Sequence, residues 1–225
     1  MTRADYPRCG PGPALRRLLA AGLVALGLLG DPGAASAQVP FFLSRTGQVL
    51  SLHQASPRSP TSTFATSSPV TDRVGNPWTE VGTWSAEFRP APFVDVMSAG
   101  DLRVWVEPEK RAESRTAFDL RVEVWVKGVG TTPVRVAHGM SRCIAAAPGD
   151  PNTPQPVVIP FTSTDTTFSN GTETLSLKVL TRVGTTPEDK RCNGPGAAQA
   201  NAIGLRVYFG SATYPSRFDL LFAIP

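Results

Sequence analysis

Tryptophan and arginine alternate in two segments of the chain, and this pattern could bind sugars. DLRVWVE contains Arg103 and Trp105, and AFDLRVEVWVK contains Arg121 and Trp125. Rigid aromatic rings stack well on other flat faces, including those of sugars. If the two segments pair as a hairpin, Arg121 lies across from Trp105 and can stack on it. We therefore expect a polysaccharide-binding face at Trp105, Trp125, Arg103 and Arg121.

The same tryptophans have a second interpretation. Large aromatic side chains are usually mostly buried, so Trp105 and Trp125 could pack beneath loops or against a second sheet. The remaining aromatic candidates for a carbohydrate platform are Trp78, Trp84, Tyr208 and Tyr214.

One segment approaches a serine-hydrolase motif without completing it. Gly139-Met140-Ser141-Arg142-Cys143 matches the nucleophile elbow G-x-S-x-G except at its final glycine, and a strand-rich context surrounds it. The elbow needs a turn from a strand into a helix. His53 and His138 are the two histidines of the chain, which leaves little material for a catalytic triad or a histidine-rich zinc site. We expect His138 to be a strand residue, and we expect no catalytic residue.

Loop carboxylates are the remaining metal candidates. Asp150, Asp165, Glu188 and Asp189 carry oxygens of the kind that calcium prefers, but their spacing matches no calcium loop. We expect no metal site and no cofactor.

The amino terminus predicts an export signal over residues 1–37. Four arginines precede an apolar run from Leu18 to Gly30, and Ala35-Ser36-Ala37 supplies small residues for cleavage. An uncleaved anchor is the alternative, but the run is shorter than a membrane span of about 20 residues. Removing the leader removes four arginines and two aspartates, which lowers the formal net charge from +4 to +2. No basic stripe remains for nucleic acid, and no membrane span is expected after signal removal. We therefore expect the periplasm, the cell surface or the extracellular space.

Two cysteines remain in the exported chain. An even pair in an oxidising compartment predicts a disulfide between Cys143 and Cys192. If the strands ending near Met140 and near Arg182 run in the same direction, both cysteines lie at one end of the fold. Two buried free thiols are the alternative.

Period-two alternation dominates the mature chain and predicts an all-β fold. Leu102, Val104 and Val106 share one face of the first segment, and residues 120, 122, 124 and 126 share one face of the second. Further strands are expected near 134–140, 157–161, 173–182, 204–209 and 218–224. We predict a single antiparallel β-sandwich of jelly-roll type over residues 38–225, with about nine strands. A Ser/Thr/Pro-rich segment near 54–77 is expected to be a surface crossing or an extended arm.

Four segments between Phe93 and Leu220 carry a family resemblance. FVDVMSAGDLRVWVE, AFDLRVEVWVKG, VRVAHGMSR and GLRVYFGSATYPSRFDL resemble the jelly-roll, galactose-binding-like domain at the C-terminus of cocaine esterase and X-prolyl dipeptidyl-peptidase hydrolases. A similar pattern occurs in exported bacterial β-sandwich proteins of unknown function. In those hydrolases the catalytic serine belongs to a separate α/β domain, so the resemblance implies a fold and no reaction.

Three functions are compatible with these observations. The first is an exported, non-catalytic module that binds extracellular or cell-surface polysaccharide. The second is a structural or protein-interaction component of the cell envelope or matrix, which presents its N-terminal segment to another envelope protein. The third and most remote is an exported hydrolase using Ser141 and His138.

Overall fold

The computed structural model describes residues 35–44, 48–51, 63–70, 75–88, 96–109, 117–128, 130–145, 153–163, 173–188, 190, 192 and 204–224. Residues 34–225 form one compact unit, which contains all the strands that the structure describes. The expected leader lies outside the described residues except for Ala35-Ser36-Ala37, which begin the first strand. The described residues include no helix long and apolar enough to cross a membrane.

Eleven strands make up the described fold, and all their pairings are antiparallel. They are β1 (Ala35–Leu43), β2 (Leu50–Ser51), β3 (Thr63–Thr66), β4 (Thr79–Phe88), β5 (Val96–Pro108), β6 (Phe118–Gly128), β7 (Val134–Ile144), β8 (Gln155–Ser163), β9 (Glu173–Val183), β10 (Leu205–Phe209) and β11 (Arg217–Ile224). Nine follow the order β2-β1-β11-β5-β8-β7-β6-β9-β4, while β10 pairs with β3 and β5. The prediction of an all-β antiparallel sandwich is confirmed.

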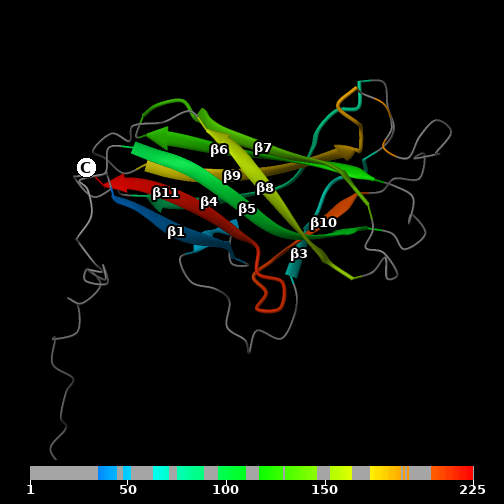
Figure 1. The fold of residues 1–225 in the computed structure, drawn as a ribbon, viewed down its shortest axis with the longest axis horizontal. Coiled ribbons are helices and arrows are strands. Elements are labelled where there is room, and N and C mark those ends of the chain that lie inside the picture. Colours follow the sequence, from blue (N-terminus) through cyan, green and yellow to red (C-terminus); the bar gives the residue numbers. More distant parts are fainter. Residues whose placement is uncertain are drawn as a thin grey trace, which may run out of the picture. The chain divides into compact units, whose positions relative to one another are not determined.

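Strand β8 joins the two layers of the sandwich. Its first part, Gln155 to Pro160, pairs with β5, and its last part, Phe161 to Ser163, pairs with β7. Figure 1 shows β8 running obliquely from the β5 side toward the β7 side. One layer therefore contains β2, β1, β11, β5, β10 and β3, and the other contains β7, β6, β9 and β4.

The core between the layers follows the period-two faces expected from the sequence. Leu102, Val104 and Val106 of β5 are buried, as are the alternate residues Leu120 and Val122 of β6. Trp84 of β4 belongs to the same core and is fully buried. Because both layers turn their apolar faces inward, their polar faces point in opposite directions, away from the core.

Two arrangements that the sequence left open are not found among the described strands. Strands β5 and β6 do not form a hairpin: β5 pairs with β8, β11 and β10, whereas β6 pairs with β7 and β9. The described part of the Ser/Thr/Pro-rich segment is also not a detached arm. Residues 63–66 form β3 and pair with β10, and Val70 is buried in the core.

Candidate functional site

A β-bulge in β7 sets the outer face on which the site lies. The register between β6 and β7 shifts where Val124 pairs with Ala137 and Trp125 pairs with Arg135. Val136 is the extra residue, and both Val136 and Ala137 are buried. The bulge therefore turns Arg135 and His138 outward together, although simple alternation would place them on opposite faces. His138 is a strand residue, as expected, and the bulge places it on the outer face.

A pocket of about 340 Å³ opens on this outer face. Its lining combines four arginines with one histidine, one methionine and one indole ring: Arg121, Arg135, Arg142, Arg182, His138, Met140 and Trp78. The arginines come from three adjacent strands, since β6 lies between β7 and β9. The ring comes from the segment just before β4.

Trp78 is held over two of the arginines. The guanidinium carbon of Arg182 lies 4.5 Å from the ring centroid, and that of Arg121 lies 5.7 Å from it. A turn at Gly75 and Asn76, both with positive φ, precedes the ring. The Asn76 side-chain amide donates to the carbonyl oxygen of Val183 at 2.7 Å, which fixes this segment against the end of β9. Cation–π contacts of this kind place the ring and the guanidinium groups side by side.

Glu123 organises one half of the pocket. Its side chain is only 9% exposed and pairs with Arg121 and with Arg135, whose Nη1 lies 3.2 Å from Oε1. The indole Nε1 of Trp125 donates to Oε2 at 3.0 Å. Trp125 is therefore a supporting neighbour of the pocket and is not part of its lining.

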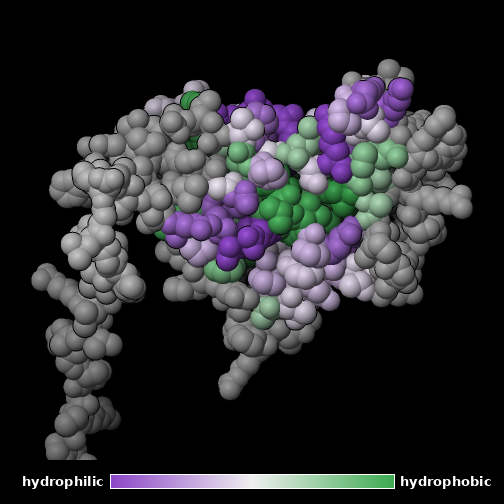
Figure 2. Space-filling view, viewed as in Figure 1, coloured by the Kyte–Doolittle hydropathy of each residue, from purple (hydrophilic) through white to green (hydrophobic). Residues whose placement is uncertain are grey.

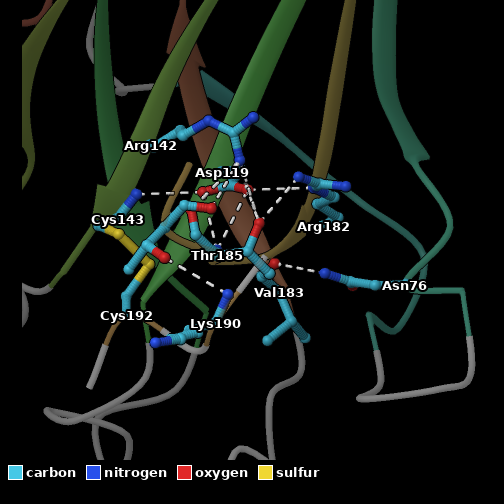
Figure 3. Close-up of a disulfide and its surroundings, with 10 residues drawn as sticks. Asn76, Asp119, Arg142, Cys143, Arg182, Val183, Thr185, Lys190 and Cys192 are labelled. Carbon is cyan, nitrogen blue, oxygen red and sulfur yellow. Dashed lines mark hydrogen bonds and ion pairs between the residues drawn. A yellow bond between two sulfur atoms is a disulfide. The ribbon is translucent and has the colours of Figure 1, made fainter. Parts of the chain in front are cut away.

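Asp119 organises the other half and is completely buried. Arg182 Nε donates to its Oδ2 at 3.0 Å, and the hydroxyl of Thr185 donates to the same oxygen at 3.1 Å. The backbone N–H of Cys143 donates to Oδ1 at 3.1 Å. Figure 3 shows these contacts converging on the carboxylate. A buried charge needs such partners, because leaving it unpaired would cost several kcal/mol.

Arg142 is fixed by the loop that follows β9. Its Nη1 donates to the carbonyl oxygens of Thr185 and Thr186, each at 3.3 Å, and lies 3.8 Å from Oδ2 of Asp119. The same guanidinium lines the pocket. The loop between β9 and β10 thus supports the pocket wall.

The predicted disulfide is present beside Asp119. Cys143 and Cys192 are bonded with their Cα atoms 5.5 Å apart. Cys143 lies near the end of β7, and Cys192 lies in the loop after β9. Both strands are antiparallel neighbours of β6 and so end at the same end of the sandwich. At Gly184, a Cβ atom would come within 2.9 Å of the Cys192 sulfur, so a residue without a side chain suits this position.

The predicted ligand face is divided between the two layers. Trp105 and Arg103 belong to β5, whereas Trp125 and Arg121 belong to β6, and the two polar faces point in opposite directions. Arg121 therefore does not stack on Trp105. It contacts Trp78 instead.

Trp105 has a packing role in its own layer. Its ring centroid lies 5.2 Å from that of Tyr214, and Tyr214 lies 5.3 Å from Tyr208. Its backbone N–H donates to the hydroxyl of Ser216 at 3.2 Å. Because β10 and β11 pair with successive parts of the same edge of β5, Ser216 bridges the junction between them. The segment Tyr214-Pro215-Ser216 thus lies where the pairing of β5 changes from β10 to β11.

The hydrolase-like segment belongs to a strand that becomes irregular at the segment's last residue, Cys143, which has a positive φ of 55°. Gly139 to Cys143 lies within β7, and Ser141 pairs in register with Leu120 of β6. It does not make the strand-to-helix turn on which a nucleophile elbow depends. Of the loop carboxylates, only Glu188 lies within the described residues.

The sequence showed some residues of this pocket and missed others. Trp78 was one of the aromatic candidates, and Arg121 was placed on a ligand face. Arg135, Arg142 and Arg182 were missed, because their proximity depends on strand order and on the bulge in β7. Alternation along β9 does place Arg182 opposite the buried Leu175, Leu177 and Val179, which was the available signal.

Comparison with known proteins shows a similarity of fold but does not assign the chain to a family. No protein-family model and no curated protein sequence matches the chain. The structure is similar to that of a CocE/NonD family hydrolase from Staphylococcus aureus, with 16% identity and a TM-score of 0.52, covering 84% of this chain and 37% of the hydrolase. A second alignment, to the VP2 subviral particle of infectious bursal disease virus, has 13% identity, a TM-score of 0.32 and coverages of 92% and 46%. The chain thus resembles part of a CocE/NonD hydrolase in fold.

Proposed function

We propose that this protein is an exported, non-catalytic β-sandwich that binds an extracellular or cell-surface polysaccharide. The observation that carries the proposal is the half-buried indole of Trp78 in an open pocket, surrounded by guanidinium donors. An aromatic face with a few fixed polar groups suits a sugar ring, which has apolar C–H faces and hydroxyl edges. The binding face is thus moved from Trp105 and Trp125 to Trp78.

Two further observations support an exported binding protein. The disulfide suits an oxidising compartment such as the periplasm or the extracellular space. The location of Gly139 to Cys143 within strand β7, without a turn into a helix, supports a role without serine catalysis, and we propose no catalytic activity.

The proposal is tested by polysaccharide binding of the oxidised protein, exported under its own leader. We expect binding to at least one of a panel of soluble and insoluble polysaccharides, and we expect Trp78→Ala to weaken it about tenfold or more, because stacking area is lost. Trp78→Phe should retain part of the affinity, since it keeps an aromatic face. Trp105→Phe is the matched control on the other layer and should bind like the parent protein.

Two results would contradict the proposal. Absence of binding across the panel would remove the polysaccharide function. Equal binding by the parent and Trp78→Ala proteins, with both folded by circular dichroism, would remove Trp78 from the binding face.

A protein-interaction role in the envelope or matrix is a second candidate, supported by the opposite layer. Figure 2 shows a hydrophobic area in the middle of the face drawn, over β5 and β8 and bordered by hydrophilic side chains. Val158 of β8 is 52% exposed. Exposed apolar areas of this kind often contact partners, and Val158→Lys would abolish such a contact without affecting polysaccharide binding at Trp78.

A further inference from the structure

The arginines of the pocket outnumber the carboxylates that hold them. Arg121 and Arg135 pair with Glu123, and Arg142 and Arg182 pair with Asp119. Four positive charges thus form ion pairs with two negative charges, which leaves a surplus of two among these pairs. Glu188, in the loop after β9, adds a solvent-exposed negative charge that attracts Arg142 without forming an ion pair with it. Both carboxylates lie beneath the guanidinium groups, with side-chain exposures of 9% and 0%. The surface offered to a ligand is therefore cationic.

Hydrogen-bonding capacity is also left over in the pocket. Each guanidinium carries five N–H donors, and a single carboxylate oxygen accepts from both Arg121 and Arg135. The Nε of Arg121 is buried and has no hydrogen-bond partner among the described residues. A buried donor without a partner is costly, so an acceptor from a ligand would offset that cost.

The guanidinium groups are held in place before any ligand binds. Arg182 is fixed by Asp119, by Thr185, whose hydroxyl accepts from Nη2 at 2.8 Å, and by the ring of Trp78. Arg142 is fixed by two backbone carbonyls of the β9–β10 loop. Less side-chain freedom is then lost on binding. Fixed planar guanidinium groups suit carboxylate and sulfate oxygens, which they can bind through two parallel hydrogen bonds.

We propose that the pocket recognises the acidic groups, carboxylate or sulfate, of an acidic polysaccharide. This inference rests on the proposed function and narrows its ligand class. The acidic group lies among the arginines while the sugar ring stacks on Trp78. A neutral polysaccharide could accept hydrogen bonds through its hydroxyl groups but would leave the surplus positive charge without a counter-charge.

Matched pairs of polymers test the charge requirement. Polygalacturonate is compared with its methyl ester, and dextran sulfate with dextran, so that each pair differs in charge on one backbone type and carboxylate is separated from sulfate. We expect the charged member of at least one pair to bind at least tenfold more tightly, and added salt to weaken that binding because ionic contacts are screened.

Two arginine variants locate the binding. Arg135→Gln removes a 41% exposed guanidinium while Arg121 still pairs with Glu123, so the fold should persist. We expect it to lose roughly ten- to a hundredfold in affinity, the effect of one hydrogen bond to a charged group. Arg103→Gln makes the same charge change on the exposed face of the other layer and should bind like the parent protein.

Each outcome bears on the inference in a definite way. Equal binding of charged and neutral polymers, unchanged in Arg135→Gln, would overturn the acidic specificity and leave the proposed function standing. No binding to any polymer would overturn both. Equally tight binding of a DNA duplex, lost in Arg135→Gln, would show that the pocket reads charge alone and would overturn the assignment to saccharides.

Discussion

Burial of Tyr208 links the stability of the fold to alkaline pH. The ring is 7% exposed, and its hydroxyl donates to the carboxylate of Glu107, which also accepts from Arg206 at 3.3 Å. Burial, together with the hydrogen bond and the negative charge of Glu107, raises the pKa of Tyr208 far above its ordinary value. In the unfolded chain the phenol loses its proton near pH 10. The stability that Tyr208 contributes is therefore fully present below pH 10 and declines as the pH rises above it.

We expect the free energy of unfolding to fall above pH 10 for this reason, and chemical denaturation at several pH values would measure it. In the folded protein, tyrosinate absorbance should show no contribution from Tyr208 near pH 10, because its pKa is raised. The control is Tyr208→Phe, which should be less stable at neutral pH because Glu107 loses a donor, with a weaker decline above pH 10. Titration of Tyr208 near pH 10 in the folded protein would contradict the argument.

Individual pocket residues were predictable from the sequence only where residue type or alternation along one strand identified them. The tryptophan and tyrosine residues were candidates for a carbohydrate platform because of their residue type. Alternation along the strand placed Arg121 on an outward face. It could not join Arg135 and Arg182 to Trp78, since these residues meet through the order β7-β6-β9 and through the turn at Gly75 and Asn76. Strand order depends on long-range pairing, which period-two patterns do not encode.

For the strands, the sequence predicted which face is buried but not which strands pair with each other. The buried faces of β5 and β6 agree with alternation. The hairpin considered for them does not form, since a polar connection between two strands does not require that they pair. Strand β3 was missed, since Thr63–Thr66 lies in a segment whose composition favours loops. Its partner β10 lies far along the chain.

The crossing of β8 between layers depends on Gly139 of β7. A Cβ atom at this position would lie 2.4 Å from the carbonyl oxygen of Pro160 and 2.8 Å from Cγ2 of Ile159. These are the residues just before β8 begins to pair with β7. The glycine therefore allows the two backbones to approach closely at the corner of the sandwich.

We expect Gly139→Ala to lower the free energy of unfolding by roughly 1–3 kcal/mol, because β8 must move away from β7. Equilibrium unfolding in urea would measure this change. Gly128→Ala is the control at the end of β6, where a Cβ atom would meet only the side chain of Thr131, at 3.3 Å. A loss in Gly139→Ala no larger than in the control would show that the corner tolerates a side chain.

The disulfide connects the stability of the whole sandwich to the pocket. It joins residues 49 apart in sequence and lies against Asp119, the carboxylate that fixes Arg182 and attracts Arg142. The Cys143 N–H is one of the donors to Asp119, and Cys192 N–H donates to the carbonyl oxygen of Gly184 at 3.3 Å. The bond therefore holds together the end of β7 and the loop that supports the pocket wall.

We expect the Cys143→Ser/Cys192→Ser protein to lose roughly 2–4 kcal/mol of unfolding free energy, because the unfolded chain is no longer restricted by a closed loop. Because Cys143 and Cys192 also anchor the surroundings of Asp119, binding of the charged polymer should weaken in the same protein. Chemical denaturation and binding titrations would measure the two effects, with the parent protein treated with dithiothreitol as the matched control. If the folded double variant binds the charged polymer as tightly as the parent protein, the disulfide stabilises its loops without shaping the pocket, and the contacts of the arginines with neighbouring side chains and carbonyl groups are sufficient to hold them.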